Sequence, residues 1–195
     1  MSKSHHLHIG ERQGINYSPL LPSARKVSNA LLEPASAAQN IAMRISAKAD
    51  YAVRAAVVLA AESSNGPLKA EAVARSQEIP LKFLLNILSD LKHGRIVSSH
   101  RGIYGGFQLA RPASDITVAD VIRAVEGPLA SVHEILPEDV RYPPPSESLQ
   151  QVWIAVRASL RSVLEAVTIA DLASGSLPAH IVALNSNPEA WAVRR

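Results

Sequence analysis

The chain has 195 residues, of which 47% are hydrophobic and none is cysteine, and its formal net charge at pH 7 is +3. Without cysteine it can form no disulfide, no thiolate nucleophile and no cysteine-ligated iron–sulfur cluster, and no apolar run approaches the roughly 18 residues that span a bilayer. No secretory signal is recognisable either, so we expect one domain with extensions in the cytoplasm.

Residues 1–42 differ from the rest of the chain and are expected to be a disordered leader. They contain three prolines, many small polar residues and no sustained hydrophobic period. His5, His6 and His8 have the composition of a metal-binding tract, but a flexible polar leader, or a start site assigned too far upstream, is the simpler interpretation. Met43, where the periodic pattern begins, is the alternative initiator.

Two helices are predicted next. Ser46 is a suitable N-cap for a helix over residues 47–62, which ends before Asn65-Gly66-Pro67. A shorter helix follows over residues 69–76, and its small apolar residues can pack beneath another helix. Residues 76–79 then form a turn.

A third helix and a hairpin follow this turn. Pro80 suits the first turn of the helix, where its missing N–H needs no partner, and leucines recur at helical spacing until Gly94 ends it. Short strands over residues 95–99 and 107–110 flank a basic, glycine-rich loop, residues 100–106. Such a helix can enter a major groove of DNA while an arginine at the hairpin tip enters a neighbouring minor groove.

This arrangement predicts a winged helix-turn-helix domain over residues 43–128, with double-stranded DNA as its partner. Residues 1–42, 43–125 and 126–195 carry net charges of +2, +4 and −3. A modest imbalance of this kind is also found on ordinary solvated surfaces, so the position of the cations is more informative than their number. The cations that flank the helix and the hairpin are Lys82, Lys92, Arg95, Arg101 and Arg111.

A further capped helix and a loop are predicted after the hairpin. Thr117 and Asp120 have the spacing of a capping box, and Gly127-Pro128 ends the helix. Residues 129–145 are expected to form a loop that contains His133 and several carboxylates. A histidine–carboxylate metal site is one interpretation. A solvated acidic loop with one incidental histidine is the simpler one, and we predict no metal or cofactor.

The longest helical pattern extends over residues 146–173, and residues 174–195 are expected to be a loosely ordered tail. The apolar stripe of this helix either packs on its own domain or pairs with its copy in a two-fold dimer. The dimer suits a protein that reads two half-sites. The predicted dimer interface consists of Leu149, Val152, Trp153, Val156, Leu160, Val163 and Val167.

Three motifs resemble the Rrf2 family of bacterial winged helix-turn-helix regulators: MRISAKADYAVRA at residues 43–55, HRGIYGGFQLARP at residues 100–112 and DITVADVIRAVEGPL at residues 115–129. The likeness continues through the LQQVW…TIADL segment, which ends at Leu172. It implies a mainly α-helical fold with a small β-hairpin wing and a long C-terminal dimerisation helix. It also implies a homodimer that binds a partly palindromic operator.

The resemblance assigns DNA contacts to the start of the recognition helix and to the wing: Lys82, Asn86, Arg101, Gly102, Tyr104 and Gly105. Asparagine can pair with adenine, and lysine can donate to guanine or to phosphate. A solvated Asn86 and a sequence-neutral phosphate contact by Lys82 are the alternatives. Leu85 departs from the family pattern, in which many members carry a polar residue, so the resemblance does not specify the operator sequence.

This chain departs further from the family pattern in the sensing interval, which lies between the EGP segment and the long helix. Many members hold a cluster with three cysteines there, whereas this chain has none and resembles the cluster-free members, which respond to other cues. We therefore predict a homodimeric transcriptional repressor whose effector is unspecified, and not an enzyme, since no phosphate loop or nucleophile motif is present. The alternative is a winged-helix interaction module that senses through a protein partner and binds DNA weakly.

Overall fold

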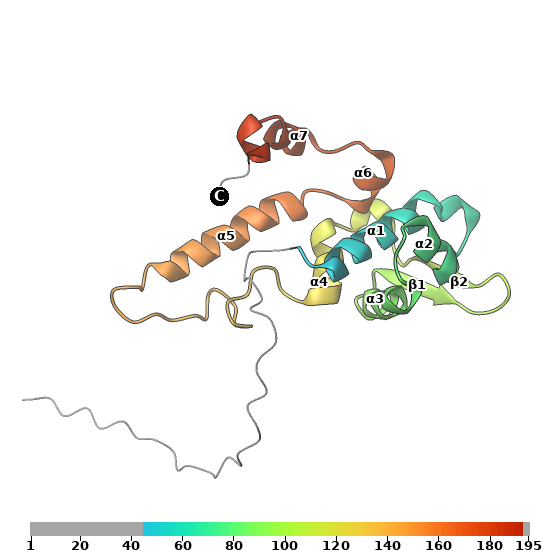
Figure 1. Ribbon diagram of the computed structural model, residues 1–195, viewed down its shortest axis with the longest axis horizontal. Coiled ribbons are helices and arrows are strands. Elements are labelled where there is room, and N and C mark those ends of the chain that lie inside the picture. The colour runs from blue at the N-terminus through green and yellow to red at the C-terminus, as the bar shows by residue number, and fades with distance from the viewer. Residues whose placement is uncertain (1–44, 193–195) are drawn as a thin grey trace, which may run out of the picture. The chain divides into compact units, whose positions relative to one another are not determined.

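The computed structural model describes residues 45–192, so the predicted leader, its histidines and Met43 lie outside the described residues. The described part is mainly helical with a small antiparallel hairpin, which confirms the predicted fold class (Figure 1). Its helices are α1 (Ala47–Ala61), α2 (Ala70–Ser76), α3 (Leu81–His93), α4 (Val118–Glu126), α5 (Leu149–Leu164), α6 (Ile169–Ser174) and α7 (Ala179–Asn185), and its strands are β1 (Val97–His100) and β2 (Gly106–Leu109). Short 3-10 helices occur at η1 (Ser63–Asn65), η2 (Ala113–Asp115) and η3 (Pro188–Trp191).

Helix α1 lies at the centre of the fold and contacts α3, α4 and α6. Its predicted N-cap is confirmed, because the Ser46 hydroxyl accepts a hydrogen bond from the Ala49 N–H at 3.0 Å. Its buried face is made mostly of alanines, including Ala52, Ala55 and Ala56, each 0% exposed. Small side chains let the neighbouring helix backbones approach closely, so a single helix can support several others.

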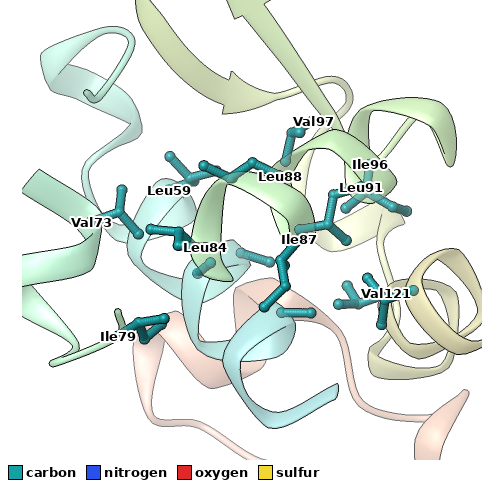
Figure 2. Packing of buried hydrophobic residues seen from close by; sticks show 14 of the residues in the cluster. Leu59, Val73, Ile79, Leu84, Ile87, Leu88, Leu91, Ile96, Val97 and Val121 are labelled. Atoms are coloured by element: carbon teal, nitrogen blue, oxygen red, sulfur yellow. The ribbon is translucent and has the colours of Figure 1, made fainter. Parts of the chain in front are cut away.

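The hydrophobic core forms around one face of α3. Its residues Leu84, Ile87, Leu88 and Leu91 are each 0% exposed. Figure 2 shows them among side chains from α1, α2, the turn before α3, the start of the hairpin and α4: Leu59, Val73, Ile79, Ile96, Val97 and Val121. Truncating one such leucine to alanine costs about 2–5 kcal/mol. This packing fixes the rotation of α3 about its axis and therefore decides which side chains face outward.

The hairpin is shifted by one or two residues from the predicted strands 95–99 and 107–110. Its register pairs Val97 with Leu109 and His100 with Gly106. Arg95 cannot join the first strand, because its φ of 56° lies in the left-handed region. That conformation turns the chain sharply after Gly94, the predicted end of α3.

A third segment extends the hairpin sheet. The Leu68 N–H donates to the Phe107 carbonyl at 2.8 Å, and the Phe107 N–H donates to the Leu68 carbonyl at 2.7 Å. The backbones approach so closely that a Cβ on Gly106 would lie 2.3 Å from the Leu68 carbonyl oxygen. A glycine is therefore required at the base of β2, and the bridge anchors the hairpin to the segment before α2.

The single helix predicted over residues 146–173 is wrong, because α5 ends at Leu164 and α6 begins at Ile169. Thr168 and Asp171 form a capping box, in which the Thr168 hydroxyl accepts from the Asp171 N–H at 3.1 Å. The predicted box of Thr117 and Asp120 at the start of α4 is confirmed. The two caps lie together, since the Ile169 N–H donates to the Ile116 carbonyl at 2.8 Å.

The structure agrees with the loop predicted over residues 129–145 but shows more order than expected in the tail after residue 174. Residues 129–145 contain no helix or strand of the described chain, although Val132 and Ile135 pair across a tight turn. The tail, expected to be loosely ordered, contains α7 and the buried Ile181. Among residues 45–192, no helix is both long and apolar enough to cross a membrane.

Candidate nucleic-acid interface

A short turn between α2 and α3 sets the position of the third helix. The Ile79 side chain is 4% exposed and its N–H donates to the Ala74 carbonyl at 2.9 Å. The guanidinium of Arg54 on α1 donates to the backbone carbonyl and, at 3.3 Å, to the side-chain oxygen of Gln77. Glu78 has a φ of 54°, a left-handed conformation that lets the chain reverse here. The turn is therefore held by both backbone and side-chain contacts.

The outward face of α3 carries both residues that the sequence assigned to base contacts. Lys82 and Asn86 are exposed, and Leu85 between them is 46% exposed. Phe83, although 38% exposed, contacts Tyr51 of α1 edge to face, with ring centroids 5.8 Å apart. The face thus presents an ammonium, an apolar side chain and an amide within about one turn of helix.

The wing loop carries its exposed side chains on a glycine-built turn. Arg101 is exposed, and Ile103 and Tyr104 are 83% and 92% exposed. Gly102 has a φ of 104° and its carbonyl accepts from the Gly105 N–H at 3.0 Å. We refer to Lys82, Leu85, Asn86 and wing residues 101–105 as the α3–wing surface.

The structure explains why position 105 is a glycine, which the sequence alone did not reveal. It is buried, and a Cβ there would lie 2.2 Å from the His100 carbonyl oxygen. Gly105 is therefore required for the shape of the loop, and its assignment as a DNA-contacting residue stays a prediction. Arg101 and Tyr104 remain free to reach outward.

Six exposed cations in or beside α2, α3 and the hairpin form no ion pair in the part of the chain that the structure describes: Lys69, Arg75, Lys82, Lys92, Arg95 and Arg101. Other cations are held by carboxylates: Lys48, Arg54, Arg111, Arg123, Arg157 and Arg161. Arg111, one of the five cations predicted to flank the recognition elements, therefore belongs to the paired group. The unpaired charges produce a positive field that a polyanion can neutralise.

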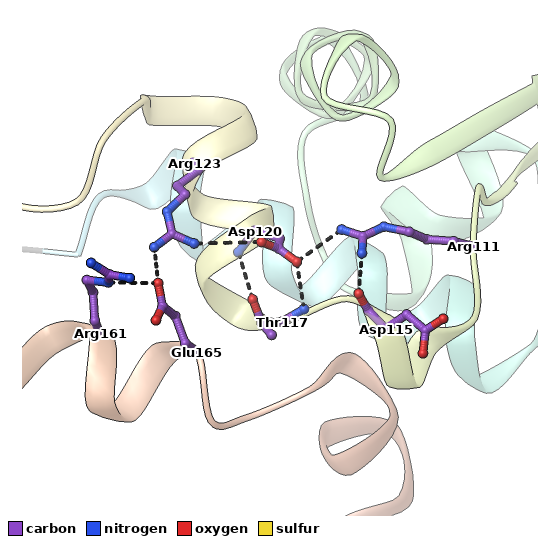
Figure 3. Close-up of polar contacts among 7 residues, drawn as sticks. All are labelled: Arg111, Asp115, Thr117, Asp120, Arg123, Arg161 and Glu165. Atoms are coloured by element: carbon purple, nitrogen blue, oxygen red, sulfur yellow. Dashed lines mark hydrogen bonds and ion pairs between the residues drawn. The ribbon is translucent and has the colours of Figure 1, made fainter.

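A chain of ion pairs connects the end of the hairpin to α4 and α5 (Figure 3). The Arg111 guanidinium contacts the Asp120 carboxylate at 3.0 Å and donates to the Asp115 carbonyl. Arg123 lies 3.7 Å from Asp120 and also pairs with Glu165, the residue that follows α5. Arg161 pairs with Glu165 at 2.9 Å. These contacts join the part of the chain predicted to bind DNA to the segment predicted to dimerise.

The two carboxylates in this series of ion pairs, Asp120 and Glu165, have lowered pKa values. Burial alone would raise the pKa of Asp120, but hydrogen bonds from Thr117 and Arg111 outweigh it and lower the pKa below its ordinary value of 3.8. Hydrogen bonds from Arg123 and then Arg161 lower the pKa of Glu165 below 4.5. Both groups are therefore ionised at neutral pH, and their cationic partners stay engaged.

Helix α5 has an apolar stripe but no fully buried residue. Val152 is 49% exposed, and the other predicted interface residues on this helix are half-buried. Trp153 donates from its indole N–H to the Tyr142 hydroxyl at 2.9 Å, which ties the preceding loop to the helix. Val167 is different: it lies after α5 and is only 6% exposed. Its assignment to the exposed stripe is wrong, because the break before α6 turns it inward.

An apolar pocket that the sequence did not predict lies where α5 meets the ends of α1 and α4. Its volume is about 270 Å³. Its apolar lining comes from three parts of the chain: Ile45, Ala49, Ile122, Leu129, Leu160 and Leu164. Leu160 belongs both to this pocket and to the stripe of α5, so the two apolar surfaces are continuous.

The donor groups between α4 and α5 do not fit a cysteine-ligated metal cluster. The chain contains no cysteine, and no group of three or more His, Asp or Glu residues among those described is arranged to hold a metal. Glu138 is already engaged by Arg157, and hydrogen bonding to its own backbone and to Arg157 lowers its pKa. His133 and Glu134 lie in the tight turn with φ values of 50° and 65°.

Comparison with known proteins gives a consistent result. Residues 45–175 match the family described as Rrf2, iron-dependent transcriptional regulator. The HTH-type transcriptional regulator CymR of Bacillus subtilis is 32% identical over 132 residues, which are 68% of this chain and 91% of CymR. Rv1287 of Mycobacterium tuberculosis, whose name provisionally assigns it to the HTH-type transcriptional regulators, is 51% identical over 142 residues, which are 73% of this chain and 88% of Rv1287.

Solved structures show the same fold. The structure of CymR, named as the global cysteine regulator of B. subtilis, matches with a TM-score of 0.58 and 30% identity over 69% of this chain and 98% of that chain. The structure of T. potens IscR matches with a TM-score of 0.55 and 28% identity over 78% of this chain and 94% of that chain. The winged-helix architecture is therefore shared with regulators of transcription.

Proposed function

Because the chain belongs to the Rrf2 family of HTH-type transcriptional regulators, we propose that it is a homodimeric repressor that binds a partly palindromic operator. Helix α3 enters the major groove and the wing enters a neighbouring minor groove. Lys82 and Asn86 contact base edges or phosphate, and Arg101 is the minor-groove residue. The rate of transcription then falls because the dimer occupies the promoter.

The observation that carries this proposal is the set of unpaired cations near the α3–wing surface. Charged side chains without partners are ordinary when scattered, but here they accompany an exposed helix face and an exposed hairpin tip. Neutralising DNA phosphates releases condensed counterions, which is a large favourable contribution to binding. The ion pairs of Arg111 and Arg123 show that carboxylates are placed beside cations elsewhere in the same domain.

The dimer is supported by the apolar stripe of α5 and the pocket that continues it. Val152, Val156 and Leu160 are left half-buried or exposed in a single copy. A second copy related by two-fold symmetry would cover the same stripe on both chains. It would also place two α3 helices to read two half-sites.

We further propose that the signal is sensed without an iron–sulfur cluster. A cluster of this kind is held by cysteine thiolates, and the chain has none. The iron named in the family description therefore has no cysteine-based site here, and the effector must act through other groups.

The test is selection of duplexes from fragmented genomic DNA by the full-length protein. A variant with Lys82→Gln and Arg101→Gln is the matched control, since both side chains are exposed and contribute little to the core. We expect enrichment of a partly palindromic sequence, two chains per duplex by mass, and little enrichment by the control. Equal recovery by parent and control, or no enrichment by either, would contradict the proposal and favour a protein-interaction module.

A further inference from the structure

The recognition helix presents an apolar residue where a DNA-reading surface ordinarily carries polar ones. Leu85 is 46% exposed, and it lies outside the hydrophobic core cluster that contains its neighbours Leu84 and Leu88. Leu81, one turn earlier, is 37% exposed. A leucine held in water forgoes the stabilisation that burial would provide, so this position favours a partner with an apolar group.

The surroundings of Leu85 restrict the kind of partner. Lys82 and Asn86 flank it on the same face. Two cations without an ion-pair partner among the described residues are Lys92, in the last turn of the helix, and Arg95, just beyond its end. An apolar protein surface would leave these charges without partners when it covered them. Duplex DNA supplies phosphates for the cations and base edges for the amide, and its major groove offers one apolar group, the C5-methyl of thymine.

We propose that Leu85 is a specificity-determining residue that packs on the methyl group of a thymine in each half-site. This inference rests on the proposed function, because it requires α3 to enter the major groove. Asn86 is the next residue along the helix and is suited to a bidentate pair with adenine. The two side chains together therefore select a half-site in which a thymine stands close to the adenine that Asn86 reads.

The test uses the duplex recovered by selection with the full-length protein. Each thymine is replaced in turn by deoxyuridine, which removes the methyl group and leaves the hydrogen-bonding edge of the base unchanged. The parent should bind about fourfold more weakly when one particular thymine of a half-site is replaced, the effect expected for one methyl group returned to water. Restoring the methyl group at that site with thymine should restore the affinity.

Two variants complete the test. Leu85→Ala should distinguish the deoxyuridine and thymine duplexes much less than the parent, because its short methyl side chain does not extend as far as the leucine side chain. Asn86→Ala should lose its preference for adenine yet keep the sensitivity to deoxyuridine. Both positions are exposed, and circular dichroism of the variants should match that of the parent.

The outcomes separate this inference from the proposed function. If the parent binds the duplex but no thymine replacement weakens it, Leu85 does not contact a methyl group. If Leu85→Ala keeps the full sensitivity, another side chain makes the contact, and the inference is wrong although DNA binding stands. If the parent binds no duplex in the first place, the proposed function fails together with the inference.

Discussion

The α3–hairpin region and the α4–α6 region leave different kinds of group without a partner. Around α3 one apolar face is buried and several nearby cations have no ion-pair partner among the described residues, as Leu88 and Lys92 illustrate. Around α5 the cations are paired and the apolar stripe is left partly exposed, as Arg161 and Val152 illustrate. The first pattern favours a polyanion and the second favours an apolar surface. The protein thus has two surfaces, and the unpaired cations of one and the exposed apolar stripe of the other indicate what each binds.

The largest expected effect comes from placing a charge on the stripe of α5. Val152→Glu should convert the dimer to a monomer, because a carboxylate buried in a dimer interface without a partner costs several kcal/mol. We expect the dimer dissociation constant to rise at least about 100-fold. Sedimentation or light scattering measures the mass, and operator affinity should fall with it.

The matched control for this variant is Gln151→Glu, which introduces the same charge at the adjacent exposed position on α5. It should leave the mass unchanged. A Val152→Glu protein that remains a dimer would show that the stripe is covered by its own chain and that dimerisation, if present, occurs elsewhere.

A smaller effect is expected from the wing. Arg101→Ala should weaken operator binding by about 5- to 150-fold, the range for an arginine that contacts DNA directly. The melting temperature should be nearly unchanged, since Arg101 is exposed and forms no ion pair among the described residues. Fluorescence anisotropy with labelled duplex measures the affinity.

Arg161→Gln is the control for the wing variant, because Arg161 lies on α5 and is paired with Glu165. It should bind DNA like the parent, provided that the dimer persists. If Arg161→Gln loses as much affinity as Arg101→Ala, the distinction between paired and unpaired cations has no bearing on DNA binding.

Acid should weaken the ion-pair chain between the two regions. The pKa values of Asp120 and Glu165 are lowered in the folded protein, so the unfolded chain takes up protons first as the pH falls. Their stabilisation is complete above the ordinary values of 3.8 and 4.5 and is lost as the pH falls through the lowered ones. Urea titrations should therefore show a free energy of unfolding that declines below about pH 4.5.

The Asp120→Asn variant isolates one carboxylate in this acid response. Its free energy of unfolding should be lower at neutral pH and should decline less steeply in acid than that of the parent. Asp115→Asn serves as the control, because the Asp115 carboxylate joins no ion pair in the described range 45–192. Parallel acid profiles for parent and Asp120→Asn would mean that the chain of ion pairs contributes nothing to stability.

The smallest expected effect concerns the turn before α3. Glu78→Gly should raise the free energy of unfolding by up to about 1 kcal/mol, because glycine adopts a left-handed φ without the steric penalty of a Cβ. Glu71→Gly, within helix α2, should instead lower it by about 1 kcal/mol. Destabilisation by both variants would show that the turn does not hold Glu78 in this conformation.

Local signals in the sequence predict most of the elements. Ser46 and the box of Thr117 and Asp120 mark helix starts because the capping contacts span only a few residues. Thr168 and Asp171 have the same spacing and the same contacts. The apolar period continues through the break before them and hides this signal, so the pattern predicts one helix where the structure has α5 and α6.

Features that depend on distant contacts are not predictable in this way. The left-handed conformation of Arg95 shifts the first strand, and the approach of Leu68 makes Gly106 necessary. The pairing of Arg111 with Asp120 removes one of the flanking cations from the candidate site. Only the folded chain separates paired from unpaired cations, and Lys82 and Arg101 of the α3–wing surface form no ion pair among the described residues.

The salt dependence of operator affinity tests the central claim most directly. The logarithm of the binding constant should fall linearly with the logarithm of salt concentration, with a slope of about −0.9 per phosphate neutralised. In a variant with Lys82, Lys92 and Arg101 all changed to Gln, the slope should become shallower by about 0.9 for each phosphate that the variant leaves unneutralised, whereas Arg161→Gln should keep the parent slope. A parent slope near zero, or one that the triple variant leaves unchanged, would contradict the claim that these unpaired cations bind DNA.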